Sequence, residues 1–126
     1  MPGYDSTAFR PPAPLAHVTL RARESDFIVA AVPMLLDSGA DVSLLPRSAV
    51  ASLIDGRDDL PHYELAGFDG HVSLAPAVTL ELEFLVKSFR GRFLIIDDAI
   101  GILGRNVMNS FALAFNGPQL TWNVMA

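Results

Sequence analysis

A strict alternation of apolar and polar residues in the middle of the chain constrains the fold more than any other feature of the sequence. In the segment 78–84, VTLELEF, the apolar residues Val78, Leu80, Leu82 and Phe84 alternate with Thr79, Glu81 and Glu83. This period of two puts the apolar set on one face of an extended strand, whereas a helix would scatter it around its axis. The segment is therefore expected to be a half-buried β-strand, followed by a turn at 87–91 and a second strand in 90–98.

Three further segments place a turn between extended, largely apolar flanks: 16–36, 63–76 and 111–124. Each pattern is typical of a β-hairpin, because residues with strand preference lie on both sides of polar, glycine or proline residues. In the first segment Pro33 cannot donate a hydrogen bond to a neighbouring strand, so an edge, a bulge or a kink is expected there. The middle of the chain is therefore expected to be a β-meander.

Two short helices are expected within this all-β pattern. Pro46 is well placed to open a helix through 48–54, and a second one is expected in 105–111. The prolines near the N-terminus predict a flexible, extended or poorly ordered arm over residues 1–15. Residues 16–126 contain no repeat or linker and are expected to form one domain.

Composition limits the class of protein and its partners. The 126 residues are 51% hydrophobic and 18% charged, which suits a single domain with a real core. A net charge of −5 argues against nucleic acid or an anionic membrane as a partner. The sequence has no cysteine and therefore no thiolate site, which fits a cytoplasmic location. The N-terminus does not resemble a secretion signal, and no segment is long and apolar enough to cross a bilayer.

The segment 33–46, PMLLDSGADVSLLP, brings a carboxylate to the end of an apolar run. A charge in that position is costly to bury unless it is paired, shared or used in chemistry. Asp37 is therefore either the cap of a turn or a reactive group, and the motif Asp-Ser-Gly alone does not decide between them. Two later features narrow the choice, namely the hairpin turn at 67–70 and the motif ILGRN at 102–106.

Taken in this order, the three features resemble the retropepsin-like aspartic peptidases, single-domain relatives of the retroviral proteases with bacterial and cellular members. The resemblance covers roughly 18–124. It rests on the apolar residues before Asp37, on Ser-Gly-Ala after it, and on the later apolar-apolar-Gly before a short helix. It implies an all-β, closed-barrel type of acid protease fold with a flap hairpin, assembled as a homodimer.

The resemblance also implies a mechanism. Peptide hydrolysis needs one group that activates water and another that protonates the leaving nitrogen, and two carboxylates that share a proton can do both. This chain has a single Asp-Ser-Gly motif and is too short for two lobes, so the family pattern implies a homodimer with one Asp37 from each subunit. Because one proton is held between the two carboxylates, activity is expected at mildly acidic pH.

The same resemblance implies structural roles for the residues that follow Asp37. Ser38, Gly39 and Ala40 are expected to support the active-site loop, and Ser38 is expected to hydrogen-bond across the twofold axis. An ordinary turn hydroxyl is the alternative for Ser38. An ion pair between Asp41 and Arg105 is expected to lock the second helix to this loop, because a guanidinium fork matches a carboxylate.

The turn at 67–70 has the place of the family's flap, a hairpin that closes over an extended peptide. Its residues are Gly67, Phe68, Asp69 and Gly70. A plain surface hairpin has the same sequence pattern, so both interpretations stay open at this point. Apolar residues expected to line the cleft are Ala40, Val42, Phe68 and the run 100–103, and they imply a preference for hydrophobic residues beside the scissile bond.

The leading hypothesis is a homodimeric aspartic endopeptidase that acts on peptide or protein segments without a cofactor. His17, His62 and His71 lack the spacing of a zinc site, so no metal is expected. The hairpin in 111–124 is expected to form part of the dimer contact, and Trp122 lies either there or in the core. The alternative is a catalytically silent module of the same fold that binds peptide or mediates dimerisation.

Overall fold

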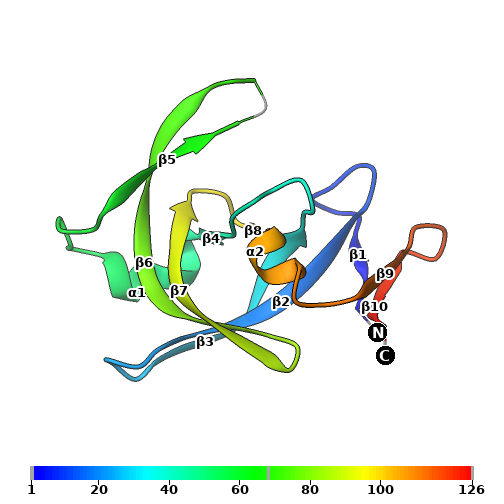
Figure 1. The fold of residues 1–126 in the computed structure, drawn as a ribbon, viewed down its shortest axis with the longest axis horizontal. Coiled ribbons are helices and arrows are strands. Elements are labelled where there is room, and N and C mark those ends of the chain that lie inside the picture. The colour runs from blue at the N-terminus through cyan, green and yellow to red at the C-terminus, as the bar shows by residue number, and fades with distance from the viewer. Residues whose placement is uncertain (1, 68, 126) are drawn as a thin grey trace.

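The alternating segment forms the central strand of the structure. The computed structural model describes residues 2–67 and 69–125, and Figure 1 shows its elements. Strand β6, Val72–Phe84, pairs with strand β7, Lys87–Ile96, and the four apolar residues of the alternation are buried, whereas the polar residues between them are not. Strand β6 is longer than expected, because the second half of the hairpin predicted in 63–76 continues through Pro76 into the alternating segment without a break.

Six strands in the described part of the chain form a closed barrel. Strand β2, Ala13–Ala22, pairs with β3, Phe27–Leu36. The order continues through β8, Gly101–Leu103, and β4, Leu44–Pro46, to β7 and β6. Strand β6 then pairs with β2, which completes the ring, and one cluster of buried apolar side chains fills the interior. The prediction of an all-β, closed-barrel fold is therefore confirmed.

The irregularity expected near Pro33 is a bulge in β3. The register of β3 against β2 shifts between Val18 and Leu20, and Ala31 has a φ of 58°. A bulge of this kind bends a strand and increases its twist, which helps a sheet to close on itself. Pro33 lies two residues further on, opposite His17 of β2.

Both short helices are present. Helix α1, Arg47–Ile54, begins directly after Pro46, and its Val50 and Ile54 are buried in the core. Helix α2, Arg105–Met108, is a single turn that follows β8. In the described part of the chain, no helix combines the length and the apolar character that crossing a membrane requires.

The N-terminal residues differ from the expected arm. Strand β1, Tyr4–Asp5, pairs with the start of β2, and β2 begins at Ala13, so the boundary expected between residues 15 and 16 falls inside a strand. Main-chain hydrogen bonds from Tyr4 to Leu120 and from Trp122 to Pro2 also attach this segment to the C-terminal hairpin. Backbone pairing at both sides holds the segment to the barrel although its prolines cannot donate.

The C-terminal hairpin confirms the strands predicted in 111–124. Strand β9, Leu113–Asn116, pairs with β10, Thr121–Val124. Trp122 is 2% exposed, and its indole Nε1 donates to Leu15 O at 3.0 Å. Of the two places considered for Trp122, the core is correct within this chain.

The hairpin formed by strand β5, His62–Ala66, and the first part of β6 projects from the barrel. Figure 1 shows this arm, which holds the turn at 67–70, extending away from the strands and bending over them. Val72 and Leu74 on the arm are 52% and 67% exposed. The arm therefore has little packing of its own and can move relative to the barrel more easily than the core strands can.

The junction of β8 and α2 passes directly against the loop that follows Asp37. A Cβ atom on Gly104 would lie 2.3 Å from Val42 O and 2.9 Å from Ala40 O. A Cβ atom on Gly101 would lie 2.5 Å from Leu44 O. These neighbours are backbone atoms, which cannot turn aside as the end of a long side chain can, so this close approach requires glycine.

The substitution Gly104→Ala should lower the free energy of unfolding by about 3 kcal/mol, because the added methyl group forces two packed backbone segments apart. Gly91→Ala is the matched control, since a Cβ atom there meets nothing within 4 Å. Urea unfolding followed by tryptophan fluorescence measures both variants. Equal unfolding midpoints for Gly104→Ala and the wild type would contradict the close approach.

Candidate active site

Asp37 lies at the end of β3, where the apolar run stops. The last three residues of β3 pair in parallel with β8, and the Asp37 N–H donates to Leu103 O at 3.1 Å. Met34 and Leu36 are buried, whereas Asp37 itself is only partly buried. The apolar run therefore packs in the core as far as its last residue and leaves the carboxylate at the rim of the barrel, where its desolvation cost is small.

One oxygen of the Asp37 carboxylate shapes the loop. Oδ1 accepts a hydrogen bond from the Gly39 N–H at 2.9 Å, and the Ala40 N–H donates to the main-chain oxygen of Asp37 at 3.2 Å. This is an Asx-type turn, so Asp37 does cap a turn. The other carboxylate oxygen accepts no hydrogen bond from the described residues, which leaves it available to water or a substrate.

Arg105, the first residue of α2, holds this loop by two contacts. Its main-chain N–H donates to Ala40 O at 2.8 Å, and its guanidinium Nη1 donates to Ser38 O at 2.7 Å. The expected ion pair with Asp41 is wrong, because no carboxylate of the described residues lies within ion-pair distance of Arg105. The loop presents its main-chain carbonyls to α2, and Asp41 instead lines a cavity.

Ser43 makes a second connection to α2 that the sequence interpretation missed. It is the only buried polar residue within the described ranges, at 1% exposure. Its hydroxyl accepts from the Gly104 N–H at 3.0 Å and donates to Asn106 Oδ1 at 2.7 Å. A hydroxyl inside the apolar run VSLLP was the available signal, because a buried polar group nearly always has a partner.

The turn at 67–70 is closed by its own hydrogen bonds. The Gly67 N–H donates to His71 O at 2.9 Å, and the Gly70 N–H donates to Gly67 O at 3.1 Å. Asp69 Oδ1 accepts from the His71 N–H at 2.9 Å, and the φ of 79° at Gly70 explains the glycine there. Phe68, which was expected at the flap tip, lies outside the described residues.

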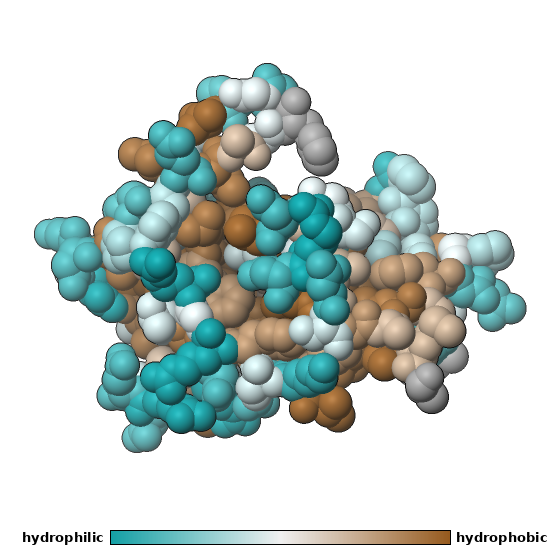
Figure 2. All heavy atoms as spheres, in the orientation of Figure 1, coloured by the Kyte–Doolittle hydropathy of each residue, from teal (hydrophilic) through white to brown (hydrophobic). Residues whose placement is uncertain are grey.

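A cavity of about 460 Å³ lies between the Asp37 loop and the projecting hairpin. Asp37, Ala40 and Asp41 belong to its loop side. The residues of its hairpin side are Leu65, Ala66, Gly67, Asp69, His71 and Ser73. Figure 2 shows the hairpin standing clear of the body of the molecule, with a hollow beneath it. The structure thus brings the predicted catalytic residue and the predicted flap to one cavity.

Only part of the predicted apolar lining is in place. Ala40, Val42 and Ile102 line the cavity, whereas Leu103 is 0% exposed and Ile100 lines a different hollow. Alternate residues of a strand face opposite sides, so a continuous run such as 100–103 cannot all face the cleft. Leu44, which lies opposite Ile102 in the sheet, lines the cavity and was not predicted.

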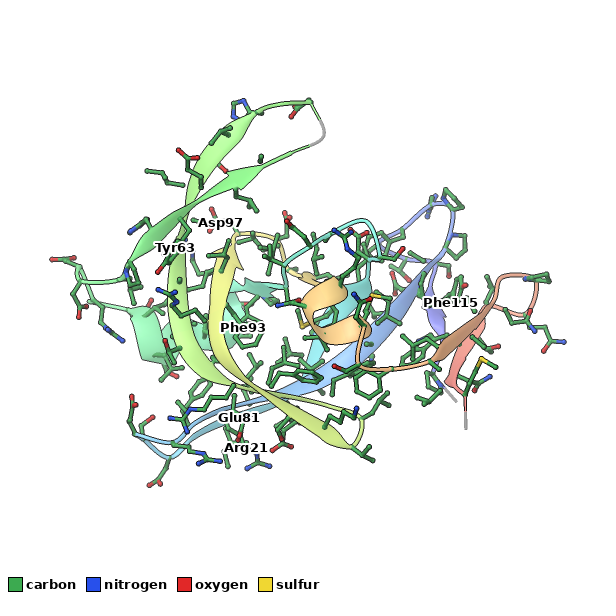
Figure 3. All side chains as sticks on the ribbon, viewed as in Figure 1. Arg21, Tyr63, Glu81, Phe93, Asp97 and Phe115 are labelled. Carbon is green, nitrogen blue, oxygen red and sulfur yellow. The ribbon has the colours of Figure 1, made fainter. Side chains whose placement is uncertain are left out.

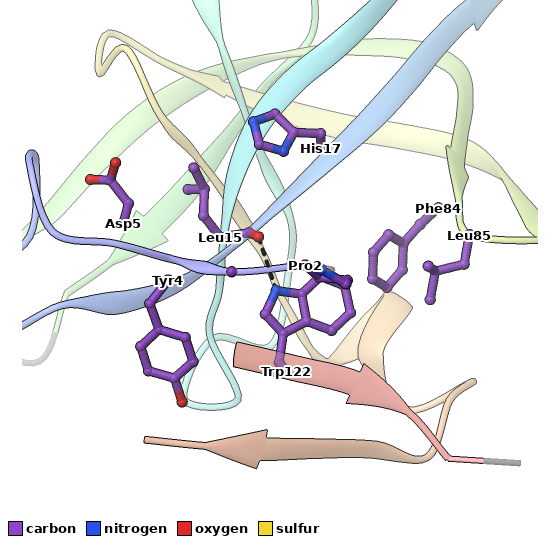
Figure 4. Close-up of a pocket in the computed structure, with 9 residues that line it drawn as sticks. Pro2, Tyr4, Asp5, Leu15, His17, Phe84, Leu85 and Trp122 are labelled. Atoms are coloured by element: carbon purple, nitrogen blue, oxygen red, sulfur yellow. Dashed lines mark hydrogen bonds between the residues drawn. The ribbon is translucent and has the colours of Figure 1, made fainter. Parts of the chain in front are cut away.

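A larger cavity of about 530 Å³ lies between the N-terminal segment and Trp122, and Figure 4 shows it. Its two acid–base side chains are Asp5 and His17. Asp5 Oδ2 already accepts a hydrogen bond from the Ala8 N–H at 2.7 Å, and the Trp122 indole is bonded to Leu15 O. None of the residues that line this cavity belongs to the Asp37 loop or to the projecting hairpin, so it is a weaker candidate for peptide chemistry than the cavity at Asp37.

The Asp37 cavity has the groups for acid–base chemistry on a bound molecule. Nowhere in residues 2–67 and 69–125 do three His, Asp or Glu side chains gather as a metal site would require. Carboxylates, by contrast, can take a proton from water and return it to a leaving group. Asp37 is the carboxylate at the end of β3, on a loop fixed by main-chain hydrogen bonds, and Asp41, Asp69 and His71 line the same cavity.

Comparison with known proteins agrees with this geometry. The structure of "EIAV protease complexed with the inhibitor HBY-793" is similar over 78% of this chain and 86% of that chain, with a TM-score of 0.55 and 23% sequence identity. The chain has a retropepsin-like fold. No protein-family model matches the sequence. At this level of identity the likeness establishes the architecture of the chain.

Arg105→Ala should lower the free energy of unfolding by about 1–2 kcal/mol, because it removes a charged donor from Ser38 O. Asp41→Ala tests the rejected ion pair and should change stability by less than about 0.5 kcal/mol. Thermal unfolding of both variants beside the wild type measures the difference. Equal losses in the two variants would show that Asp41 and Arg105 form a pair after all.

Proposed function

We propose that this retropepsin-like chain is an aspartic endopeptidase that hydrolyses peptide bonds in extended segments, with one Asp37 from each subunit of a homodimer. The observation that carries the proposal is the placement of Asp37 at the rim of the barrel, in the 460 Å³ cavity beneath the projecting hairpin. The hairpin side of this cavity offers strand backbone, to which an extended peptide can pair.

In the proposed reaction, the deprotonated Asp37 takes a proton from water as the water oxygen attacks the peptide carbonyl carbon. The protonated Asp37 of the other subunit gives its proton to the carbonyl oxygen, which forms a neutral tetrahedral intermediate. The leaving nitrogen then receives a proton from the first carboxylate, the C–N bond breaks, and the second carboxylate recovers its proton from the intermediate. Two carboxylates and one shared proton are therefore sufficient.

The loop residues support this chemistry. The Gly39 N–H, bonded to Asp37 Oδ1, fixes the orientation of the carboxylate, and Ala40 and Ser38 accept the hydrogen bonds from Arg105. Ser38 is exposed on the loop, where its hydroxyl can reach a second subunit. The turn at 67–70 acts as a flap that excludes water once peptide is bound.

The homodimer is required because one chain provides a single Asp37. Large apolar side chains on or beside the C-terminal hairpin support a contact there. The exposed fractions are 46% for Phe115, 42% for Leu120, 45% for Val124 and 59% for Met125. Burying such a surface against a second copy is favourable, so we place part of the dimer contact at this hairpin.

The wild type should cleave peptides beside hydrophobic residues, because two carboxylates that share one proton supply both the base and the acid. Asp37→Asn should lower kcat by at least about 10³-fold, because an amide cannot take a proton from water. Asp58→Asn is the matched control, since Asp58 is exposed in a remote loop. Mass spectrometry of a peptide mixture detects the products. A dimeric wild type that cleaves nothing would favour the silent peptide-binding module.

Mixing wild type with Asp37→Asn subunits tests whether the two halves share one site. If each site needs two intact subunits, then an equal mixture after full exchange should keep about a quarter of the activity of the same total amount of wild type. Fluorogenic peptide cleavage measures the activity, and sedimentation at matched concentrations confirms the dimer. A mixture that keeps half of the activity would show that each chain works alone.

A further inference from the structure

A second cavity of about 410 Å³ continues from the one at Asp37. The two cavities share the residues Asp41, Val42, Leu65 and Ala66. The second one extends along the base of the hairpin to Tyr63 of β5 and Arg92 of β7. Figure 3 shows Tyr63 where the arm leaves the barrel. Together the cavities form a trench that begins at Asp37 and ends at Arg92.

Arg92 is held at the end of this trench by an uncharged partner. Its guanidinium carbon lies 4.9 Å from the centre of the Tyr63 ring, and its Nη1 donates to the Tyr63 hydroxyl. An aromatic face attracts a cation and restricts its orientation without neutralising its charge. The guanidinium is therefore positioned, and it keeps both its charge and most of its N–H donors.

The lack of a carboxylate partner distinguishes Arg92 from four of the eight arginines in the sequence. Arg21, Arg23, Arg47 and Arg57 each form an ion pair with an aspartate or glutamate. Arg92 has no such partner among the described residues, although acidic residues outnumber basic ones by 14 to 9 in the sequence. Arg92 thus offers an unmatched positive charge to the trench.

Two carboxylates also belong to this second cavity, and their positions matter. Glu64 follows Tyr63 on β5 and lines the second cavity, but it is exposed, so solvent screens its charge. Asp41 lies at the wall shared with the first cavity, towards Asp37. Asp37, Asp41 and Asp69 line the first cavity, whereas Arg92 is the one cationic side chain among the described residues that line the second.

We propose that Arg92 is a specificity-determining residue that binds an acidic side chain of the peptide, roughly two residues from the scissile bond. This inference rests on the proposed function, because it says which side chain of a bound peptide substrate lies beside Arg92 when the scissile bond lies at Asp37. A guanidinium fork binds a carboxylate through paired N–H donors, whereas Asp41 disfavours an acidic residue closer to the reacting carbonyl. In a homodimer two such subsites lie on opposite sides of the scissile bond.

The experiment uses extended peptides with a central pair of apolar residues, in which Glu, Gln or Lys is placed at one position at a time. The wild type should cleave the Glu peptide about fivefold faster in kcat/KM than the Gln peptide at one position on each side of the bond. Arg92→Gln should abolish this difference. Arg92→Glu should reverse it and favour the Lys peptide.

Arg90→Gln is the matched control, because Arg90 lies on the same strand and lines neither cavity of the trench. It should keep the preference for Glu. A merely structural role of the Arg92–Tyr63 contact would reduce the cleavage of all three peptides equally, and that result would overturn the proposal. Unchanged preference in Arg92→Gln would overturn it as well.

A binding measurement separates failure of this inference from failure of the proposed function. Fluorescence anisotropy with the inactive Asp37→Asn protein reports the affinity for the same labelled peptides. Arg92-dependent preference for Glu in binding, without any cleavage by the wild type, would support the subsite and reject the peptidase. Cleavage that depends on Asp37 but shows no preference for Glu at any position would support the peptidase and reject the subsite.

Discussion

The parallel pairing of β3 with β8 is the constraint on which the candidate site depends. It carries Asp37 to the end of a buried strand and sets its main chain against Leu103. The chain then passes so closely over Gly101 and Gly104 that no side chain fits. The loop after Asp37 is therefore held from behind by backbone, and its carboxylate faces outward because the side towards the barrel is filled.

The loop after Asp37 is held mainly through its main-chain carbonyl oxygens, which accept hydrogen bonds. Arg105 contacts Ser38 and Ala40 through their oxygens, and Ser43 bonds the Gly104 N–H from inside the barrel. This arrangement leaves the side chain of Asp41 out of the structural network and places it in the trench beside Asp37. A loop fixed through its backbone frees its side chains for a bound molecule, which is how rigid scaffolds usually support binding.

Much of this could be predicted from local pattern. The alternation in 78–84 predicts a half-buried strand, Pro46 predicts the start of α1, and the turn residues at 67–70 predict the hairpin, because each depends on short-range geometry. The continuity of β6 through Pro76 was missed, since a proline normally interrupts a strand. The partner of Arg105 was also missed, because a carbonyl acceptor has no signature in the sequence.

The sequence by itself determined the strand-rich architecture and the position of a carboxylate at the end of an apolar run, because both follow from the period and polarity of neighbouring residues. Only the tertiary structure decided what that carboxylate faces. The closure of β6 onto β2 and the arm that rises from β5 bring together segments far apart in the chain. Contacts such as Tyr63 with Arg92 then depend on strand register, which single residues do not encode.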